Sequence, residues 1–232
     1  MKIINHLIES QSVEIKEISK HSGAFKQDLP KTIILHYTAG GSSESAINTF
    51  TNPNVKASAH LVIDWDGIIT QLIPFNKIAW HAGRSSRKDK AGMNKYSIGI
   101  EIVNPGHLKK VGNQFQSWFG KMYEEQDVLS AVQRNETKER YWHKFTEEQI
   151  TTVRKICQLL IDEYGIKEIL GHEEVSPGRK TDPGPAFPLD KLRETIFNDR
   201  ENESNADESN VGFVNVDELN IRSGAGVNYE KV

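Results

Sequence analysis

Four side chains that could bind a metal or move a proton stand at two places in the chain. His172, Lys180 and Asp182 lie in GHEEVSPGRKTDPGPAF (171–187), whose glycines and prolines predict a loop shaped by turns rather than a regular helix. His36 directly follows the apolar run KTIIL. A zinc hydrolase needs three protein ligands, commonly two histidines and one carboxylate, and leaves a fourth position open. His36, His172 and Asp182 could supply such a set.

Residue types alone leave a structural role open for this triplet. Histidine and aspartate are common, and a histidine beside an apolar strand, such as His36, is usually a structural residue. The helical HExxH zinc motif is absent because Ser176 stands where its second histidine would be, which disfavours a thermolysin-like protease. The single cysteine, Cys157, excludes an intrachain disulfide and a multi-cysteine zinc site. Any metal must therefore be held by histidines and carboxylates.

Short apolar runs predict the strands that position these side chains. KTIIL (31–35) and YSIGIEIV (96–103) are rich in β-branched residues, as buried strands are. SAHLVID and GIITQLI flank Asp66-Gly67, a pair typical of tight hairpin turns. Because side chains alternate along a strand, Gly99 and Glu101 lie on one face of the second run. His36 follows the first run, so both strands are expected to contribute to the site.

The helices are marked by their ends. A short helix is predicted over 43–50, and another over 189–198. The clearest helix begins at Thr146, which forms a T-x-x-Q capping box with Gln149, and it ends at Gly165. The apolar stripe predicted for this helix consists of Ile150, Val153, Cys157, Leu160 and Tyr164.

The remaining segments are polar. Segment 104–145 carries scattered aromatic residues and is predicted to be part helix and part surface loop. Segment 198–210, NDRENESNADESN, has no aliphatic side chain larger than alanine and is predicted to be an acidic linker. The apolar pattern resumes over 211–232, which is too short for a core of its own. We therefore expect one domain over 1–197, followed by a linker and a short tail.

The composition excludes several classes of protein. The chain has 232 residues, of which 37% are hydrophobic and 26% charged, as in a globular protein. Twenty-nine basic against 32 acidic residues give a net charge of −3, so we expect no nucleic-acid partner. The sequence contains no run of about 18 apolar residues, so no segment is expected to cross a membrane. The apolar run at the N-terminus is too short for a secretory signal, so we expect cytoplasmic synthesis. We also expect the protein to be a monomer.

Five motifs occur in an order that resembles a known family: ILHYTAGG, SAHLVIDWDG, AWHAG, YSIGIEIVN and GHEEVSPGRKTDPGPAF. Together they resemble the zinc-dependent N-acetylmuramoyl-L-alanine amidases of the peptidoglycan-recognition-protein fold, the type 2 amidases, over about 30–197. The resemblance implies an α/β fold with a central mixed β-sheet flanked by helices and a zinc groove on one face. It implies one Zn²⁺ per chain, and its metal ligands fall on His36, His172 and Asp182.

The resemblance also places two catalytic residues, Glu101 and Lys180. Zinc lowers the pKa of a bound water from about 15.7 to about 7, and Glu101 could take the water proton and return it to the leaving amine. Gly99, on the same face, is expected to leave room for substrate. Lys180 is a cation suited to the oxyanion of a tetrahedral intermediate. Each residue also has a purely structural alternative: Glu101 could be a solvent-facing glutamate on an edge strand, and Lys180 could be an ordinary surface lysine.

Other polar residues of the motifs are candidates for substrate contact. His60 is expected to form part of the groove wall or to support the ligand residues from behind, without binding the metal itself. For Trp80 and His81, a packed tryptophan with a hydrogen-bonded histidine is an equal alternative, and Tyr37 could belong to the core. The full set of candidate substrate-binding residues is Tyr37, His60, Trp80, His81 and Asn104.

The tail, VNVDELNIRSGAGVNYEKV, resembles the beginning of a bacterial SH3-like module, a class that commonly binds cell-wall peptide. It is too short for a complete small barrel, so we expect it to be disordered or to pack on the amidase.

The leading hypothesis is a bacteriolytic or wall-recycling peptidoglycan hydrolase that cleaves the amide between N-acetylmuramic acid and L-alanine. Intact wall and small muropeptides both remain open as substrates, as do phage-type lysis, a delivered effector and recycling as settings. The alternative is a non-catalytic peptidoglycan-binding module of the same fold, which would have no use for Glu101, Lys180 and three metal ligands together. An unrelated zinc peptidase is a third hypothesis.

Overall fold

The structure is a computed structural model that describes the backbone of residues 1–205 and the side chains of residues 1–197. The chain divides into two units, Met1–Ile196 and Phe197–Val232. The predicted SH3-like tail over 211–232 lies outside the described residues, so it stays a prediction.

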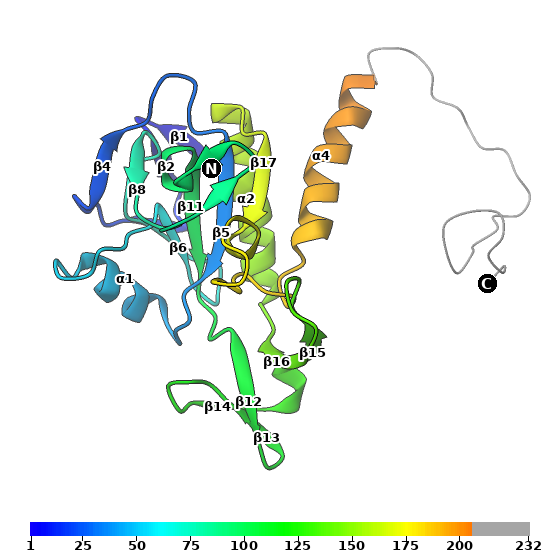
Figure 1. Ribbon diagram of the computed structural model, residues 1–232. Coiled ribbons are helices and arrows are strands. Elements are labelled where there is room, and N and C mark those ends of the chain that lie inside the picture. The colour runs from blue at the N-terminus through cyan, green and yellow to red at the C-terminus, as the bar shows by residue number, and fades with distance from the viewer. Residues whose placement is uncertain (206–232) are drawn as a thin grey trace, which may run out of the picture. The chain divides into compact units, whose positions relative to one another are not determined.

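A six-stranded mixed sheet forms the centre of the first unit (Figure 1). Its strand order is β17-β5-β11-β6-β7-β3, and all neighbours are parallel except β6 and β7, which form the predicted hairpin. The mixed α/β fold expected from the sequence is therefore confirmed. The strands are β3 (Val13–Ile15), β5 (Thr32–Tyr37), β6 (Leu61–Ile63), β7 (Ile69–Gln71), β11 (Ser97–Ile102) and β17 (Glu168–Gly171).

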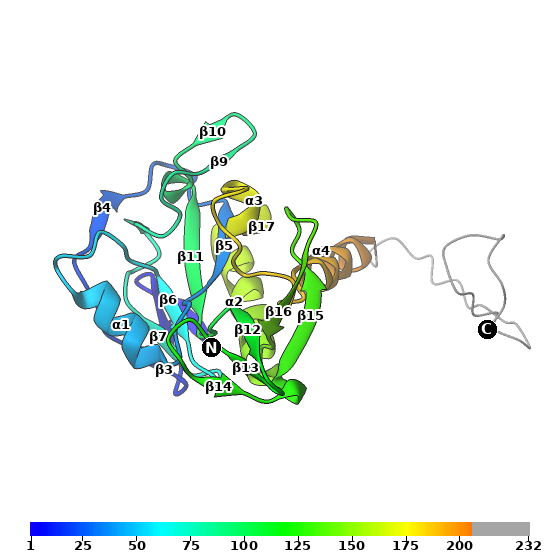
Figure 2. The same ribbon diagram turned by 60° about the horizontal axis from the view of Figure 1, so that its bottom comes forward.

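Helices cover both faces of this sheet, as Figures 1 and 2 show. Helix α1 (Ser43–Thr51) packs through Ile47 and Phe50 against Val62 and Val103, on the face that also carries Glu101. Helix α2 (Glu147–Tyr164) lies along the opposite face. Glu101 and its strand partner His36 thus lie on the face of the sheet against which α1 packs.

The ends of α2 agree with the sequence, but its buried face is broader than predicted. The capping box of Thr146 and Gln149 forms, and Gly165 ends the helix with a φ of 60°. Of the predicted stripe, Ile150 and Tyr164 are only partly buried. The buried residues are Gln149, Val153, Ile156, Cys157, Leu160 and Ile161, because the helix packs on a wide sheet that covers more than one row of side chains. Cys157 is a core residue, as expected.

The prediction of helix and loop over 104–145 is wrong. This segment forms a five-stranded antiparallel sheet of order β14-β13-β12-β16-β15, beyond the lower ends of β5 and β11 in Figure 1. Leu108, Phe115 and Tyr123 bury one face of it while their neighbours in the chain are more exposed, a period of two and not of 3.6. The strands are β12 (His107–Val111), β13 (Gln114–Gln116), β14 (Met122–Tyr123), β15 (Val128–Val132) and β16 (Glu139–His143).

The helix predicted over 189–198 is longer than expected. Helix α4 (Leu189–Asn205) buries Leu192 and Ile196 as predicted, but its backbone continues through the first part of the predicted linker. No glycine or proline interrupts 198–205, and its arginine and glutamates are good helix formers. Within residues 1–205, no helix combines the length and apolar character that spanning a bilayer requires.

Small elements complete the described part of the chain. They are three two-stranded sheets and three single helical turns: β1 (Lys2–Ile4) with β2 (Leu7–Glu9), β4 (His21–Ala24) with β8 (Lys77–Ala79), β9 (Ser86–Arg87) with β10 (Lys90–Ala91), α3 (His172–Val175), and the 3-10 turns η1 (Met93–Lys95) and η2 (Glu125–Asp127).

Candidate functional site

Parallel strand order brings the site residues to one edge of the central sheet. His36 lies near the carboxyl end of β5, and Glu101 is its direct partner on β11. On the other side of β5, strand β17 ends at Gly171, so His172 is delivered to the same edge. The carboxyl ends of adjacent parallel strands are where open α/β sheets place their ligands.

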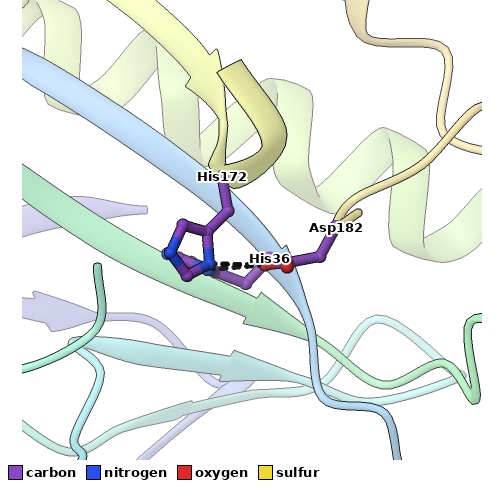
Figure 3. A group of neighbouring side chains, drawn as sticks. All are labelled: His36, His172 and Asp182. Carbon is purple, nitrogen blue, oxygen red and sulfur yellow. Dashed lines mark hydrogen bonds and ion pairs between the residues drawn. The ribbon is translucent and has the colours of Figure 1, made fainter. Parts of the chain in front are cut away.

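The three predicted metal ligands converge (Figure 3). The Nδ1 atoms of His36 and His172 are 2.9 Å apart, and each lies 2.9 Å from Oδ2 of Asp182. All three residues are buried. His36 comes from β5, His172 from the short helix α3 and Asp182 from the loop that follows, so three separate elements hold the cluster.

The donor chemistry of this cluster fits a divalent cation. Two N–H groups that both donated to Asp182 would face each other across the 2.9 Å contact between the histidine nitrogens, whereas a cation bound by all three atoms would remove this conflict. The other ring nitrogens point away: Nε2 of His172 lies 3.0 Å from the Ala82 carbonyl oxygen, as expected when Nδ1 binds a metal and Nε2–H donates to a carbonyl. Two histidines and one carboxylate are a common zinc set.

Electrostatics favour the metal-binding protonation states of His36 and Asp182. Burial and the neighbouring His172 imidazole lower the pKa of His36 to about 4, so this ring is neutral at pH 7. Burial alone would raise the pKa of Asp182, but hydrogen bonds with His172 and His36 outweigh it and hold that pKa well below its usual range. A neutral imidazole and a carboxylate bind metal without first losing a proton.

His81 acts on the cluster through His36. Its Nδ1 lies 3.0 Å from Nε2 of His36, and its own Nε2 lies 3.3 Å from the Ser97 carbonyl oxygen. If His36 uses Nδ1 for a metal, its Nε2–H donates to His81, and His81 donates in turn to Ser97. The space above Gly99 is filled by this ring, because a Cβ on Gly99 would lie 2.3 Å from Cγ of His81. The expectation that Gly99 leaves room for substrate is therefore wrong.

Removing the hydrogen-bond acceptor for His36 is expected to weaken zinc binding. His81→Phe keeps a ring of similar size but cannot accept from Nε2 of His36, so we expect zinc affinity to fall about 10- to 100-fold. Competition with a chromogenic chelator measures this affinity directly. His107→Phe, at an exposed histidine on β12, is the matched control. Unchanged zinc affinity in His81→Phe would contradict the positioning role.

Glu101 and Lys180 face the same cavity as the metal cluster. Oε2 of Glu101 is buried and has no hydrogen-bond partner within the described residues. Burial raises the pKa of Glu101 well above its usual value, Asp182 raises it further, and the positive charge of Lys180 opposes the shift. Arg179, next to Lys180, is fixed by hydrogen bonds to the carbonyls of Ala82 and Arg84. Lys180 lies close enough to Glu101 for its positive charge to affect that carboxylate. Within residues 1–197, the Lys180 ammonium group forms no hydrogen bond or ion pair, so it remains available to a substrate.

The cavity above the cluster has a volume of about 740 Å³. Of the candidate substrate-binding residues, Tyr37, Trp80 and His81 line it. The phenol oxygen of Tyr37 lies 2.7 Å from the Thr181 hydroxyl, next to Asp182 in the chain. Helix α1 forms one wall and the loop with Arg179 and Lys180 forms another.

His60 and Asn104 do not line this cavity, and their assignment to substrate is corrected. His60 is fully buried: its Nδ1 accepts from the Gly99 amide at 3.0 Å and its Nε2 lies 2.9 Å from the Lys77 carbonyl oxygen. Asn104 is also fully buried, because its side-chain amide donates to two backbone carbonyls of residues 143 and 144 and its oxygen accepts from the Gly106 amide at 2.8 Å. Both side chains satisfy buried backbone groups.

Two lining residues, Trp118 and Phe119, are missing from the sequence prediction. They lie between β13 and β14, inside the segment that was expected to be helix and loop. An adjacent pair of large aromatic residues between short alternating strands was the available signal. The local pattern does not show that this hairpin reaches the cavity.

Comparison with known proteins agrees with this geometry. AmiD, an N-acetylmuramoyl-L-alanine amidase of Escherichia coli (strain K12), is 30% identical over 171 residues, which cover 70% of this chain and 51% of AmiD. The 1,6-anhydro-N-acetylmuramyl-L-alanine amidase AmpD of the same strain is 34% identical over 142 residues, which cover 60% of this chain and 58% of AmpD. The alignments therefore span little more than half the length of these relatives.

Solved structures show the same fold. A selenomethionine AmpD derivative superposes with a TM-score of 0.61 at 24% identity and covers 84% of this chain and 99% of its own. E. coli AmiD in complex with anhydro-N-acetylmuramic acid-L-Ala-D-γ-Glu-L-Lys gives a TM-score of 0.54 at 28% identity, over 75% of this chain and 59% of its own. The family model described as N-acetylmuramoyl-L-alanine amidase matches residues 26–185. Because this match covers well over half of the 232 residues, the chain belongs to the Amidase_2 family of N-acetylmuramoyl-L-alanine amidases.

Proposed function

We propose that this protein hydrolyses the amide bond between the lactyl group of N-acetylmuramic acid and L-alanine of the peptidoglycan stem peptide. The observation that carries the proposal is the buried cluster of His36, His172 and Asp182 at the floor of an open cavity that Glu101 and Lys180 also line. The names of AmiD and AmpD support the choice of bond, and the AmiD complex holds a peptide of anhydro-N-acetylmuramic acid.

The metal-binding role falls on the three converging side chains. His36 and His172 would present Nδ1, and Asp182 would present one carboxylate oxygen, to a single Zn²⁺. When bound there, zinc would lower the pKa of a ligated water and polarise the scissile carbonyl. The second hydrogen bonds of the histidines, to His81 and to the Ala82 carbonyl, would fix their rings in the binding orientation.

Glu101 is proposed as the proton carrier. Its raised pKa makes its carboxylate a stronger base than that of an ordinary glutamate, which favours transfer of a proton from the attacking water to Glu101. As the carbon–nitrogen bond breaks, the same proton passes to the nitrogen of L-alanine, which leaves as a neutral amine. Lys180 is proposed to stabilise the negative charge that develops on the former carbonyl oxygen.

The remaining parts of the hypothesis rest on sequence alone. We propose an amidase domain over 1–197, and that 211–232 begins a wall-binding SH3-like module on the pattern LNIRSGAG. We also propose that the protein acts as a monomer on the cell wall or on fragments of it. A non-catalytic wall-binding module and a general zinc peptidase are the competing functions.

Digestion of purified sacculi and of a soluble anhydro-muropeptide tests the function. The zinc-loaded protein is expected to release new L-alanine amino termini from at least one of the two, and the chelated protein is not. Comparison of the two substrates then identifies intact wall or recycled fragments. Binding without release would instead support the non-catalytic module. Cleavage of ordinary peptides at comparable rates would support the peptidase.

A further inference from the structure

Trp118 and Phe119 are exposed aromatic side chains that line the cavity from the β13–β14 hairpin. Trp118 exposes 71% of its surface and Phe119 exposes 38%. The three residues of the metal cluster line the same cavity, as do residues of helix α1 and the loop residues Arg179 and Lys180. An aromatic pair that remains exposed beside a candidate reaction centre offers a large apolar surface to a ligand.

The pair is held in place despite its exposure. The indole N–H of Trp118 donates to the Ala39 carbonyl oxygen at 2.7 Å. The ring of Phe119 packs against Gly41, where an added Cβ would lie 3.4 Å from two ring carbons. The two rings meet edge to face, with centroids 5.6 Å apart and an interplanar angle of 89°. Both aromatic residues are thus fixed on the loop that follows β5 and its metal ligand His36.

The other cavity walls carry charged and polar groups beside the buried ring of Phe50 and the half-buried ring of Trp80, so Trp118 and Phe119 form the more exposed aromatic surface. Arg179 and Lys180 bring positive charge, and α1 contributes the hydroxyls of Ser45 and Thr49. A stem peptide that contains γ-linked D-glutamate carries a free carboxylate, which suits the cationic wall. A pyranose ring presents one face of axial C–H groups, which stacks on a flat aromatic surface. The charge of the stem peptide therefore favours the wall with Arg179 and Lys180, and the shape of the pyranose ring favours the wall with Trp118 and Phe119.

We propose that Trp118 and Phe119 form a binding surface for the pyranose ring of an N-acetylhexosamine on the carbonyl side of the scissile bond. This inference rests on the proposed amidase function. The indole stacks on the sugar ring, and Phe119 contacts its apolar edge. Because both rings are anchored before substrate binds, little side-chain entropy is lost on binding. The surface would make the enzyme prefer substrates that retain the sugar over the free lactyl peptide.

Two substrates with the same scissile amide test the proposal. One is N-acetylmuramoyl-L-Ala-D-γ-Glu-L-Lys, and the other is D-lactoyl-L-Ala-D-γ-Glu-L-Lys, which lacks the pyranose. Trp118→Ala is expected to lower kcat/KM for the sugar-bearing substrate about tenfold, chiefly by raising KM, because the apolar face of the sugar loses the surface that removes it from water. The same substitution is expected to leave kcat/KM for the lactoyl peptide unchanged. Trp118→Tyr keeps an aromatic face and should recover most of the loss.

Ile68→Ala is the matched control, since Ile68 is an exposed apolar residue in the β6–β7 turn and does not line the cavity. Zinc content and melting temperature of every variant show whether the fold and the metal site are intact. An equal loss on both substrates in Trp118→Ala would overturn the proposal, because the hairpin would then act through the loop that carries His36. No loss on either substrate would overturn it as well.

A binding measurement separates this proposal from the proposed reaction. Saturation-transfer NMR with the methyl glycoside of N-acetylmuramic acid is expected to show contact with the sugar ring protons in the wild type and its loss in Trp118→Ala. A wild type that binds this glycoside through Trp118 but hydrolyses neither substrate would refute the amidase function and keep the sugar surface. A wild type that hydrolyses both substrates equally and binds no glycoside would refute the sugar surface alone.

Discussion

Replacement of Asp182 with asparagine is expected to remove both zinc and hydrolysis. The Asp182 carboxylate is the one negative charge in the buried ligand set, and its low pKa keeps it ionised at neutral pH. Asparagine has nearly the same shape, but its neutral amide oxygen is a poor zinc ligand and its NH₂ group would oppose one of the histidine nitrogens. Loss of metal chemistry worth several kcal/mol corresponds to a fall in kcat/KM of at least about 10³-fold.

Metal analysis after dialysis and the hydrolysis rate with added zinc measure the two effects of Asp182→Asn. Zinc should also raise the melting temperature of the wild type, because a ligand that binds the folded state stabilises it, and should not raise that of Asp182→Asn. Asp190→Asn is the matched control, since Asp190 is an exposed carboxylate in ion pairs with Arg134 and Arg193. Full zinc content in Asp182→Asn would show that this residue is not a metal ligand.

Replacement of Glu101 with glutamine is expected to separate catalysis from metal binding. Glutamine keeps the size of the side chain but cannot accept the water proton, so we expect kcat to fall about 10²- to 10⁴-fold. Zinc content should stay at the wild-type level, because Glu101 is not among the three converging ligand residues. The raised pKa of Glu101 means that burial of its carboxylate opposes folding, so the neutral amide should not lower the melting temperature.

Initial rates on a soluble muropeptide, zinc content and thermal unfolding together test the role of Glu101. Glu139→Gln, at an exposed position of β16, controls for the loss of one negative charge. A kcat close to that of the wild type would rule out Glu101 as the proton carrier. A parallel loss of zinc and activity would move Glu101 into the group that holds the metal.

Several elements of the fold were predictable because their signals are local. The capping box at Thr146 and Gln149 lies within one helical turn, and the Asp66-Gly67 pair defines its own tight turn. The strand that ends near His36 is a short apolar run, and alternation along β11 places Glu101 on one face without any knowledge of its neighbours. The three ligand candidates were found from residue type and motif order, and the fold brings them within 2.9 Å of one another.

The errors concern contacts between distant parts of the chain. His60 and Asn104 were assigned to substrate because they stand in motifs that resemble those of the amidase family. In the structure, their side-chain nitrogen and oxygen atoms instead form hydrogen bonds with backbone groups. Segment 104–145 lacks a long periodic run, so its strands become stable only by pairing with one another and burying Phe115 and Tyr123 on one face.

The sequence by itself indicated the kind of chemistry that we propose: two histidines and one aspartate to bind a metal, a glutamate to transfer a proton and a lysine to stabilise charge. It also predicted most of the strands and helices that carry these residues. Tertiary structure alone decided which groups support them. His36 meets His172 across 136 residues and His81 across 45, and Trp118 reaches the loop after β5 across 79. Such contacts depend on strand order and on close packing between elements, which no local pattern of residues encodes.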